Sequence, residues 1–209
     1  MSKPLLIAHA ANSYKKIRAT LKWADLVEVD VAQNIFSGNF LLQHQAVLGK
    51  FGIGSPIRPI LAAKLQDKIL YDLKHPQWSL NFVDKFAELI INRSLEKIII
   101  VSDHWPTLGY LSQKYQFKAF YYLAKEEDKQ KFIKLLPKIS FPEGIVLASA
   151  MIDKRWLKKM QRYKLKVIVN GGENEEEVNR LAVLGIYALI TNNPPKISAD
   201  RKLTNLLAK

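Results

Sequence analysis

Cysteine is absent from the 209-residue sequence, and its absence excludes several kinds of protein. Without thiols the chain can form neither a disulfide framework nor a thiolate metal site, so packing alone has to stabilise its fold. A chain that needs no disulfides also suits a reducing compartment. We therefore expect a cytoplasmic protein.

Long apolar runs are missing as well. Residues Met1 to Ala8 contain a short apolar run that ends at His9, which is too short for a signal peptide or a membrane span. No other run approaches the roughly 18 apolar residues that a transmembrane helix needs. This pattern predicts a soluble protein.

Acidic residues are few relative to basic ones. The sequence has 32 Lys and Arg against 19 Asp and Glu, a formal charge of +13. This excess favours anionic partners such as phosphate esters, a transiently bound anionic membrane surface or nucleic acid, and charge alone does not choose among them. The basic residues are spread along helix-like segments, as at Lys15, Lys16 and Arg18, and we interpret most of them as solvated outer faces. No nucleic-acid motif is recognisable, so we predict no specific nucleic-acid partner, and the oligomeric state stays open.

Eight β-rich runs alternate with segments whose apolar residues recur at helical spacing. The expected strands are Leu5–Ala8, Leu26–Val31, Ile69–Leu73, Lys97–Val101, Lys118–Leu123, Gly144–Ala148, Lys166–Val169 and Ala188–Thr191. The expected helices are Ser13–Trp23, Ile60–Gln66, Asn81–Asn92, Thr107–Lys114, Glu126–Leu136, Asp153–Tyr163, Glu175–Leu184 and Asp200–Leu207.

This alternation predicts an α/β fold. Strands that are buried on both faces read as continuous apolar runs, as residues 98–101 do, and βα alternation implies a parallel sheet. Eight such units can close into a (β/α)8 TIM barrel, which we expect to form a single domain over residues 1–209. Residues 32–59 break the rhythm, and we expect there a hairpin containing Phe40–Leu42 and a glycine-rich loop, Gly49 to Gly54, over one mouth.

Polar residues at the carboxyl ends of barrel strands carry most of the functional signal. His9 directly follows the first strand, where it can act as a general acid or base or simply bond a loop carbonyl. Glu28 and Asp30 are two residues apart, so both carboxylates point to one face of their strand. Two inward acids favour a divalent cation such as Mg2+ or Ca2+, and the alternative is Lys or Arg partners inside the barrel.

Three further candidates follow along the chain. His44 comes after the expected hairpin and can lean over the same mouth. Asp72 and Lys74 repeat the two-apart spacing at the end of the third barrel strand, with opposite charges. They form either an internal salt bridge or a third metal ligand beside a phosphate-binding ammonium.

Taken together, the order His, Glu-x-Asp, His, Asp-x-Lys resembles the pattern of the glycerophosphodiester phosphodiesterase family, over nearly the whole chain. The corresponding segments here are His9-Ala10-Ala11, Glu28-Val29-Asp30, His44-Gln45, Asp72-Leu73-Lys74, Val167-Ile168-Val169-Asn170 and the run from Leu184 to Pro194. The resemblance implies a TIM barrel of the phospholipase-C-like phosphodiesterase type and a place in lipid and glycerol metabolism.

The same resemblance implies metal-dependent hydrolysis of a small glycerophosphodiester to glycerol 3-phosphate and an alcohol. It makes His9 and His44 the acid–base pair and makes Glu28, Asp30 and Asp72 the ligands of Mg2+ or Ca2+. The implied substrate-binding residues are Lys74 and Asn170, and we add Lys125, just past the fifth strand, as a further candidate.

The sequence also departs from the family pattern. Ala10 stands where the family has Arg, and Lys125 or Arg58 is the candidate for the missing cation. Gln45 replaces an Asp, and Val167 replaces a Trp that we expect to line the pocket. Two alternatives therefore stay open: a lyase of the sphingomyelinase D-like type that forms a cyclic phosphate, and a barrel that binds phosphorylated ligands without turnover.

Overall fold

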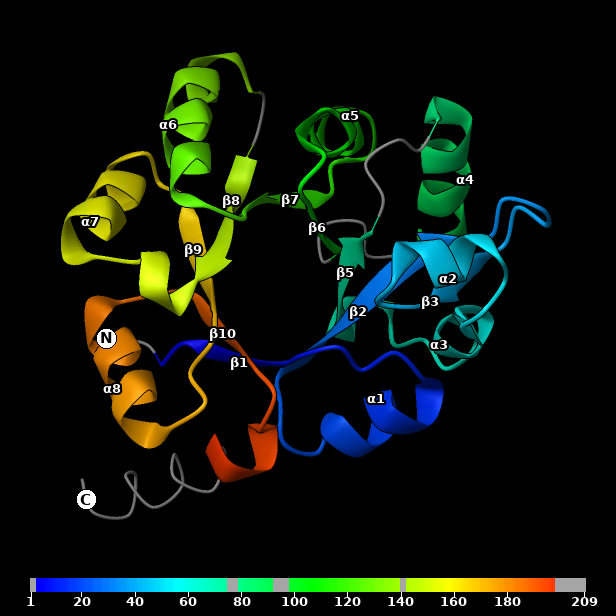
Figure 1. Cartoon of the computed structure of the whole chain (residues 1–209), viewed down its shortest axis with the longest axis horizontal. Helices are drawn as coiled ribbons and strands as arrows, with labels where there is room; N and C mark the ends of the chain where they lie inside the picture. Colours follow the sequence, from blue (N-terminus) through cyan, green and yellow to red (C-terminus); the bar gives the residue numbers. More distant parts are fainter. Residues whose placement is uncertain (1–2, 75–78, 92–97, 140–141, 198–209) are drawn as a thin grey trace.

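The computed structural model describes residues 3–74, 79–91, 98–139 and 142–197. In this part of the chain eight parallel strands form a closed barrel in the order β1, β2, β5, β6, β7, β8, β9 and β10, and β1 closes it by pairing with both β2 and β10. Helices lie around the outside (Figure 1). The expected (β/α)8 barrel is confirmed.

The barrel strands are β1 (Leu5–Ala8), β2 (Leu26–Gln33), β5 (Ile69–Leu73), β6 (Ile99–Ser102), β7 (Lys118–Leu123), β8 (Pro142–Ala148), β9 (Lys166–Asn170) and β10 (Ala188–Thr191). The α-helices are α1 (Tyr14–Thr20), α2 (Ala46–Lys50), α3 (Arg58–Ala62), α4 (Leu80–Ile90), α5 (Trp105–Tyr115), α6 (Glu126–Leu135), α7 (Lys154–Arg162) and α8 (Glu175–Leu184). The short strands are β3 (Phe40–Leu42) and β4 (Ser55–Pro56), 3-10 turns lie at Gln66–Lys68, Leu136–Lys138 and Ser149–Met151, and residues 194–197 are helical. No helix among the described residues is both long and apolar enough to cross a membrane.

The two faces of the barrel strands pack in different apolar clusters. One set of alternate residues packs outward against the helices in the larger apolar cluster, as Val27 and Val29 do. The other set fills the barrel interior with a second cluster that includes Leu26, Leu70 and Ile168. Because side chains alternate along a strand, the residues two and four positions beyond these inner apolar residues point to the carboxyl-end mouth. The mouth is therefore lined by residues that continue the inner face.

The hairpin after the second strand is confirmed. β3 pairs antiparallel with the end of β2, with Val31 opposite Leu42 and Gln33 opposite Phe40, and β4 pairs with β3. Helix α2, which the sequence analysis missed, follows the hairpin and ends inside the expected glycine-rich loop, at Lys50. A Cβ on Gly49 would lie 2.3 Å from the Ala32 Cβ, so glycine lets this helix pack closely on β2.

Most other differences from the expected elements lie at their ends. The helix expected over Ile60–Gln66 is replaced by α3 and a 3-10 turn, because Pro59 starts the helix early and Lys64 adopts a left-handed conformation with φ of 53°. The expected strand Lys97–Val101 begins at Ile99 and ends at Ser102. The expected helix Asp200–Leu207 lies outside the described residues.

Candidate active site and metal centre

Three carboxylates meet inside the mouth. Glu28 and Asp30 from β2 and Asp72 from β5 are all buried, and one oxygen from each lies within 4.8 Å of the others. Asp30 and Asp72 are register partners on adjacent strands, which explains why side chains far apart in sequence meet. The expectation that Glu28 and Asp30 share the inner face is confirmed, because the valines on either side of Glu28 pack in the outer cluster.

One lysine accompanies these three acids. The Lys74 ammonium lies 3.0 Å from Asp30 Oδ1 and also bonds Asp72 Oδ2. The internal salt bridge that was one alternative for Asp72 and Lys74 is therefore present, within a cluster that also has the composition of a metal site. One ammonium against three carboxylates leaves negative charge in excess.

This excess charge shifts the proton affinities of the cluster. Burial, followed by the charges of Asp72 and Asp30, raises the pKa of Glu28 to about 8. Burial raises the pKa of Asp72 too, against the opposing charge of Lys74. Burial also disfavours ionised Asp30, but Lys74 and a hydrogen bond from Asn12 hold the pKa of Asp30 below its usual value. The cluster thus retains a proton near neutral pH that a cation can displace.

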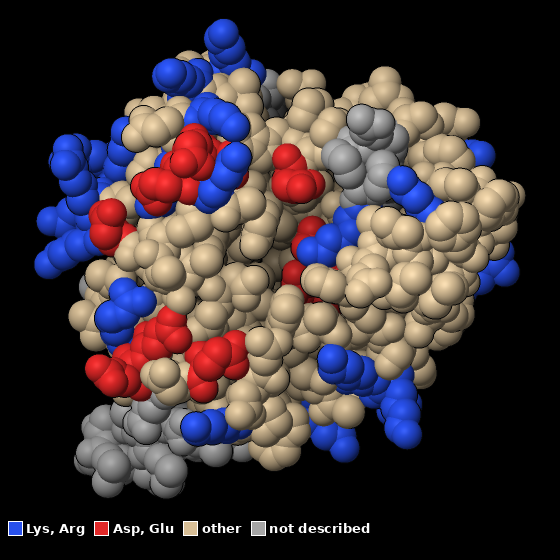
Figure 2. All heavy atoms as spheres, viewed as in Figure 1, with Lys and Arg blue, Asp and Glu red and all other residues tan. Residues whose placement is uncertain are grey.

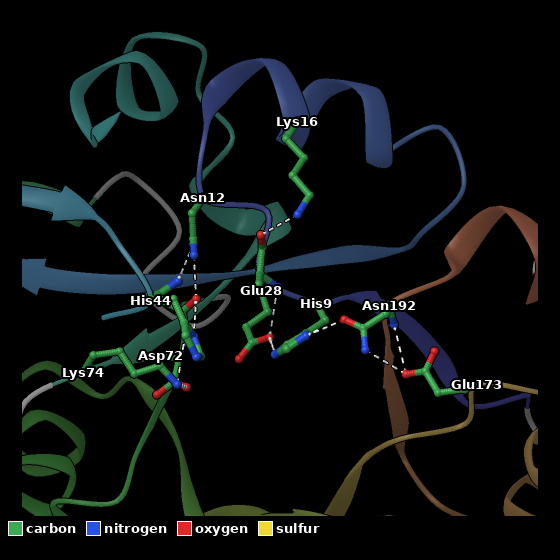
Figure 3. Close-up of polar contacts among 11 residues, drawn as sticks. His9, Asn12, Lys16, Glu28, His44, Asp72, Lys74, Glu173 and Asn192 are labelled. Carbon is green, nitrogen blue, oxygen red and sulfur yellow. Dashed lines mark hydrogen bonds and ion pairs between the residues drawn. The ribbon is translucent and has the colours of Figure 1, made fainter. Parts of the chain in front are cut away.

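His9 lies between the acidic cluster and a polar chain from β10. Its Nε2 is 3.5 Å from Glu28 Oε2, and its Nδ1 is 2.7 Å from Asn192 Oδ1 (Figure 3). Asn192 in turn donates from Nδ2 to Glu173 Oε1 at 2.9 Å. Sequence reasoning missed Asn192 and Glu173; the signal was available, since Asn192 directly follows the last barrel strand.

His44 and Asn12 both contact Asp30. His44 Nδ1 lies 3.2 Å from Asp30 Oδ2, and the His44 side chain is 59% exposed. Asn12 donates to the same oxygen at 2.6 Å and accepts from the Asp30 backbone N–H at 2.8 Å. The centroids of the His9 and His44 rings are 6.5 Å apart. The hairpin therefore brings the second histidine to the same mouth, as expected.

A hollow of about 260 Å³ opens beside the cluster and is lined by His44, Ala46, Asp72, Leu73, Lys74, Asp103 and Tyr122. Burial raises the pKa of Tyr122, which also feels the charges of Lys74 and Asp72. Asn170, one of the expected substrate-binding residues, hydrogen-bonds the Tyr122 side chain, which lines the hollow. Sequence reasoning missed Tyr122.

The cation nearest to Ala10 is neither of the two expected. Lys16 at the start of α1 is exposed, as expected for an outer helix face, and donates from Nζ to the Ala10 carbonyl at 2.8 Å (Figure 3). Ala10 itself donates its backbone N–H to Glu28 Oε2 at 3.3 Å and has a left-handed φ of 49°. The turn that follows β1 thus brings the Lys16 ammonium next to the Ala10 carbonyl.

Two expected cations lie elsewhere. Lys125 is exposed just before α6, where its backbone N–H donates to Asp128 Oδ2, and no described contact joins it to the acidic cluster. Arg58 lines a different cavity, of about 390 Å³, together with Lys85 and Leu89.

The interpretation of Val167 as a pocket position is wrong, because Val167 is buried in the outer cluster while Ile168 faces the interior. Val167 and Asn170 are three positions apart, so they lie on opposite faces of the strand, and Val167 points toward the helices.

The other histidines were not part of the expected site. His104 contacts Thr107 Oγ1 at 2.8 Å at the start of α5, which is a local contact at a helix terminus. His75 lies outside the described residues. Gln45 is exposed before α2, so the carboxylate that meets the His44 ring here is Asp30.

The chain matches no protein-family model and no curated protein. Solved structures do match it. A glycerophosphodiester phosphodiesterase from Agrobacterium tumefaciens gives a TM-score of 0.69 at 16% identity, over 95% of this chain and 99% of that one. The enzyme from Thermotoga maritima gives 0.66 at 16% identity, over 97% and 99%.

A third match carries a ligand. The structure of an Oleispira antarctica phosphodiesterase in complex with the product sn-glycerol-3-phosphate gives a TM-score of 0.65 at 13% identity, over 96% of this chain and 97% of that one. These likenesses extend over nearly the full length of both chains at low identity. This chain therefore has the (β/α)8 fold of the solved glycerophosphodiester phosphodiesterases.

Proposed function

We propose that the chain is a divergent glycerophosphodiester phosphodiesterase, a single domain that uses a divalent cation to hydrolyse small glycerophosphodiesters to glycerol 3-phosphate and an alcohol. The observation that carries the proposal is the cluster of Glu28, Asp30 and Asp72 beside two imidazoles, at the mouth of this particular fold. A phosphate-binding barrel without turnover would gain nothing from three crowded carboxylates, which are costly to bury.

The residues fit a hard divalent cation. Glu28, Asp30 and Asp72 supply the carboxylate oxygens that Mg2+ and Ca2+ prefer, and their charge exceeds that of Lys74. We infer that these three residues hold the ion, and its identity as Mg2+ or Ca2+ is part of the test below. When bound, such an ion neutralises phosphate charge and stabilises the transition state.

His9 has the geometry of a general base. Glu173 can only accept, so the amide nitrogen of Asn192 faces Glu173 and its oxygen faces His9. The His9 Nδ1 then carries the hydrogen, which leaves a lone pair on Nε2 directed toward the acidic cluster. We propose that His9 Nε2 removes the proton from the attacking hydroxyl.

His44 is then the general acid. It lies at the exposed edge of the mouth, where a leaving group can depart, and its ring is oriented by ionised Asp30. We propose that His44 protonates the leaving alkoxide oxygen.

Cations and polar groups around the hollow account for substrate binding. Lys74 lines the hollow and is the proposed ligand of a substrate oxygen, and Lys16 supplies the positive charge that Arg provides in the family pattern. Asn170 and the exposed Lys125 remain proposed substrate contacts. A cytoplasmic location also remains a prediction.

The proposal is tested by incubating the purified protein with glycerophosphocholine and Mg2+, Ca2+ or EDTA, and following the phosphorus products by nuclear magnetic resonance. We expect glycerol 3-phosphate with one of the two cations and none with EDTA. Substitution of His9 or His44 by Ala should lower kcat by about two to four orders of magnitude. Glu143→Gln, which removes only an ion pair with Lys166 near the amino end of the barrel, is the matched control.

Two results would contradict this reaction. A cyclic phosphate as the final product would indicate the lyase reaction instead. Ligand binding without turnover under every cation condition would indicate the binding barrel.

A further inference from the structure

Five large apolar side chains are exposed on the segment that interrupts the barrel. Ile35 and Phe36 in the β2–β3 connection are 54% and 76% exposed, and Val47 on α2 is 63% exposed. Phe51 and Ile53, which follow α2, are 62% and 54% exposed. We refer to the β2–β3 connection (residues 34–39) and residues 47–53 together as the apolar tip. When several large apolar side chains are exposed together, they often form a surface that binds another molecule.

The tip has a defined backbone conformation. The backbone N–H groups of Phe36 and Ser37 donate to Asn34 Oδ1, and Ile35 donates its N–H to the Lys50 carbonyl at 3.3 Å. The centroids of the Phe36 and Phe51 rings lie 6.2 Å apart, so the β2–β3 connection and the segment after α2 meet at these two rings. The apolar side chains are thus held outward by local structure.

The strands that flank the β2–β3 part of the tip join it to the active site. Asp30 lies on β2 four residues before Asn34, and the Gln43 backbone N–H at the end of β3 donates to the Asp30 carbonyl at 2.9 Å. Since a strand rises about 3.3 Å per residue, Phe36 lies at most about 20 Å along the chain from Asp30. A surface that binds the tip would therefore lie at the rim of the mouth.

Charge selects the partner. No acidic residue occurs between Val31 and Gln66, whereas Lys50, Arg58 and Lys64 do. In Figure 2 the surface over α2 and α3 is uncharged or basic, and the acidic side chains visible in this view gather in the mouth and over the helices α6 to α8. The basic α1, with Lys15, lies below α3 in Figure 1. An apolar surface on a segment that carries basic but no acidic residues is typical of binding to anionic lipid.

We propose that the apolar tip docks the barrel mouth onto an anionic phospholipid surface. Phe36 and Phe51 enter the acyl boundary, and Lys50 and the neighbouring basic residues bind headgroup phosphates. A second copy of the chain fits less well, because pairing two acid-free faces of a +13 protein brings like charges together. The proposal does not depend on the proposed hydrolysis, since lipid binding is measured without turnover.

The test is cosedimentation with vesicles of phosphatidylcholine alone and of phosphatidylcholine mixed with phosphatidylglycerol, in EDTA and at about 0.1 M salt. We expect binding to the mixed vesicles and at least about tenfold weaker binding by the double variant Phe36→Ser, Phe51→Ser. Lys50→Glu should weaken binding to the mixed vesicles only. Val183→Ser is the matched control, because Val183 on α8 is as exposed as Phe36 at 76%.

Thermal melting of the free variants should match that of the parent protein, because these side chains are exposed. Absence of binding to mixed vesicles, or equal binding by the double variant and the parent, would overturn the proposal. A dimer in solution that the double variant converts to a monomer would assign the tip to a second copy instead.

Discussion

A cluster in the barrel mouth and one on the outside of the barrel both combine aspartate with lysine, and they differ in charge balance. In the mouth Glu28, Asp30 and Asp72 share the single ammonium of Lys74. On the outside of the barrel Asp84 on α4 accepts from Lys114 Nζ at 3.0 Å and from two tyrosine hydroxyls of α5, Tyr110 at 2.7 Å and Tyr115 at 2.8 Å.

The pKa values of Glu28 in the mouth and Asp84 on the outside are shifted in opposite directions. Hydrogen bonds from Tyr110, then Lys114 and Tyr115, hold the pKa of Asp84 below its usual value. Burial and its acidic neighbours raise the pKa of Glu28 to about 8. Groups that satisfy an acid stabilise a fold, whereas acids left in surplus destabilise it until a cation binds. The contrast separates a structural cluster from a functional one.

The largest expected effect comes from Glu28→Gln compared with Asp84→Asn. Glu28→Gln should lower kcat by about three orders of magnitude, because it removes a charged cation ligand. Without added cations its melting temperature at pH 8 should equal or exceed that of the parent, because the substituted amide side chain needs no proton to be neutral. Asp84→Asn should lower the melting temperature and leave kcat unchanged. Parallel losses of stability in both variants would remove the contrast.

The second effect concerns pH and cation affinity. Because the pKa of Glu28 is raised to about 8, a cation competes with a proton below that pH. Affinity for the activating ion should therefore rise between pH 6 and pH 8 by up to about tenfold per pH unit. In the same range the cation-free protein should lose stability as pH rises, because the folded state binds this proton more tightly than the unfolded state. Calorimetric titration measures the cation affinity, and thermal melting measures the stability of the cation-free protein. A cation affinity that does not depend on pH would contradict the assignment of Glu28 as a cation ligand with a raised pKa.

The third effect tests the polar chain behind His9. Asn192→Ala should lower kcat by about tenfold to a hundredfold, because it frees the imidazole from the orientation that the Asn192 oxygen imposes. The acidic limb of the pH–rate profile should change, while the KM for glycerophosphocholine should change little. Asn81→Ala, at an exposed position on α4, is the control. If Asn192→Ala lowered the melting temperature but left kcat and the pH–rate profile unchanged, Asn192 would have only a structural role.

The smallest effect concerns the outer cluster alone. Asp84→Asn should lower the melting temperature by a few degrees above about pH 5, where Asp84 is ionised in folded and unfolded chains. The difference from the parent should shrink as pH falls through the lowered pKa of Asp84, because the parent then loses the same stabilisation. A difference that stays constant down to about pH 3 would show that this charge does not matter.

Local pattern was sufficient for most of the barrel and for the acidic cluster at its mouth. The alternation in Leu26–Asp30 placed both acids on the inner face, and the position of His9 and Asp72 at strand ends placed them at the mouth. Helix α2 could not be read in this way, because it depends on the close approach of Gly49 to Ala32 rather than on apolar spacing.

The sequence by itself determined which side chains point inward and at which end of each strand, because that depends only on the two-residue period of a strand. Tertiary structure alone decided which of them meet. Closure of β1 against β10 brings His9 to Asn192, 183 residues away, and the turn after β1 returns Lys16 to Ala10. These contacts follow from strand register and barrel closure, which cannot be predicted from the spacing of residues along the sequence.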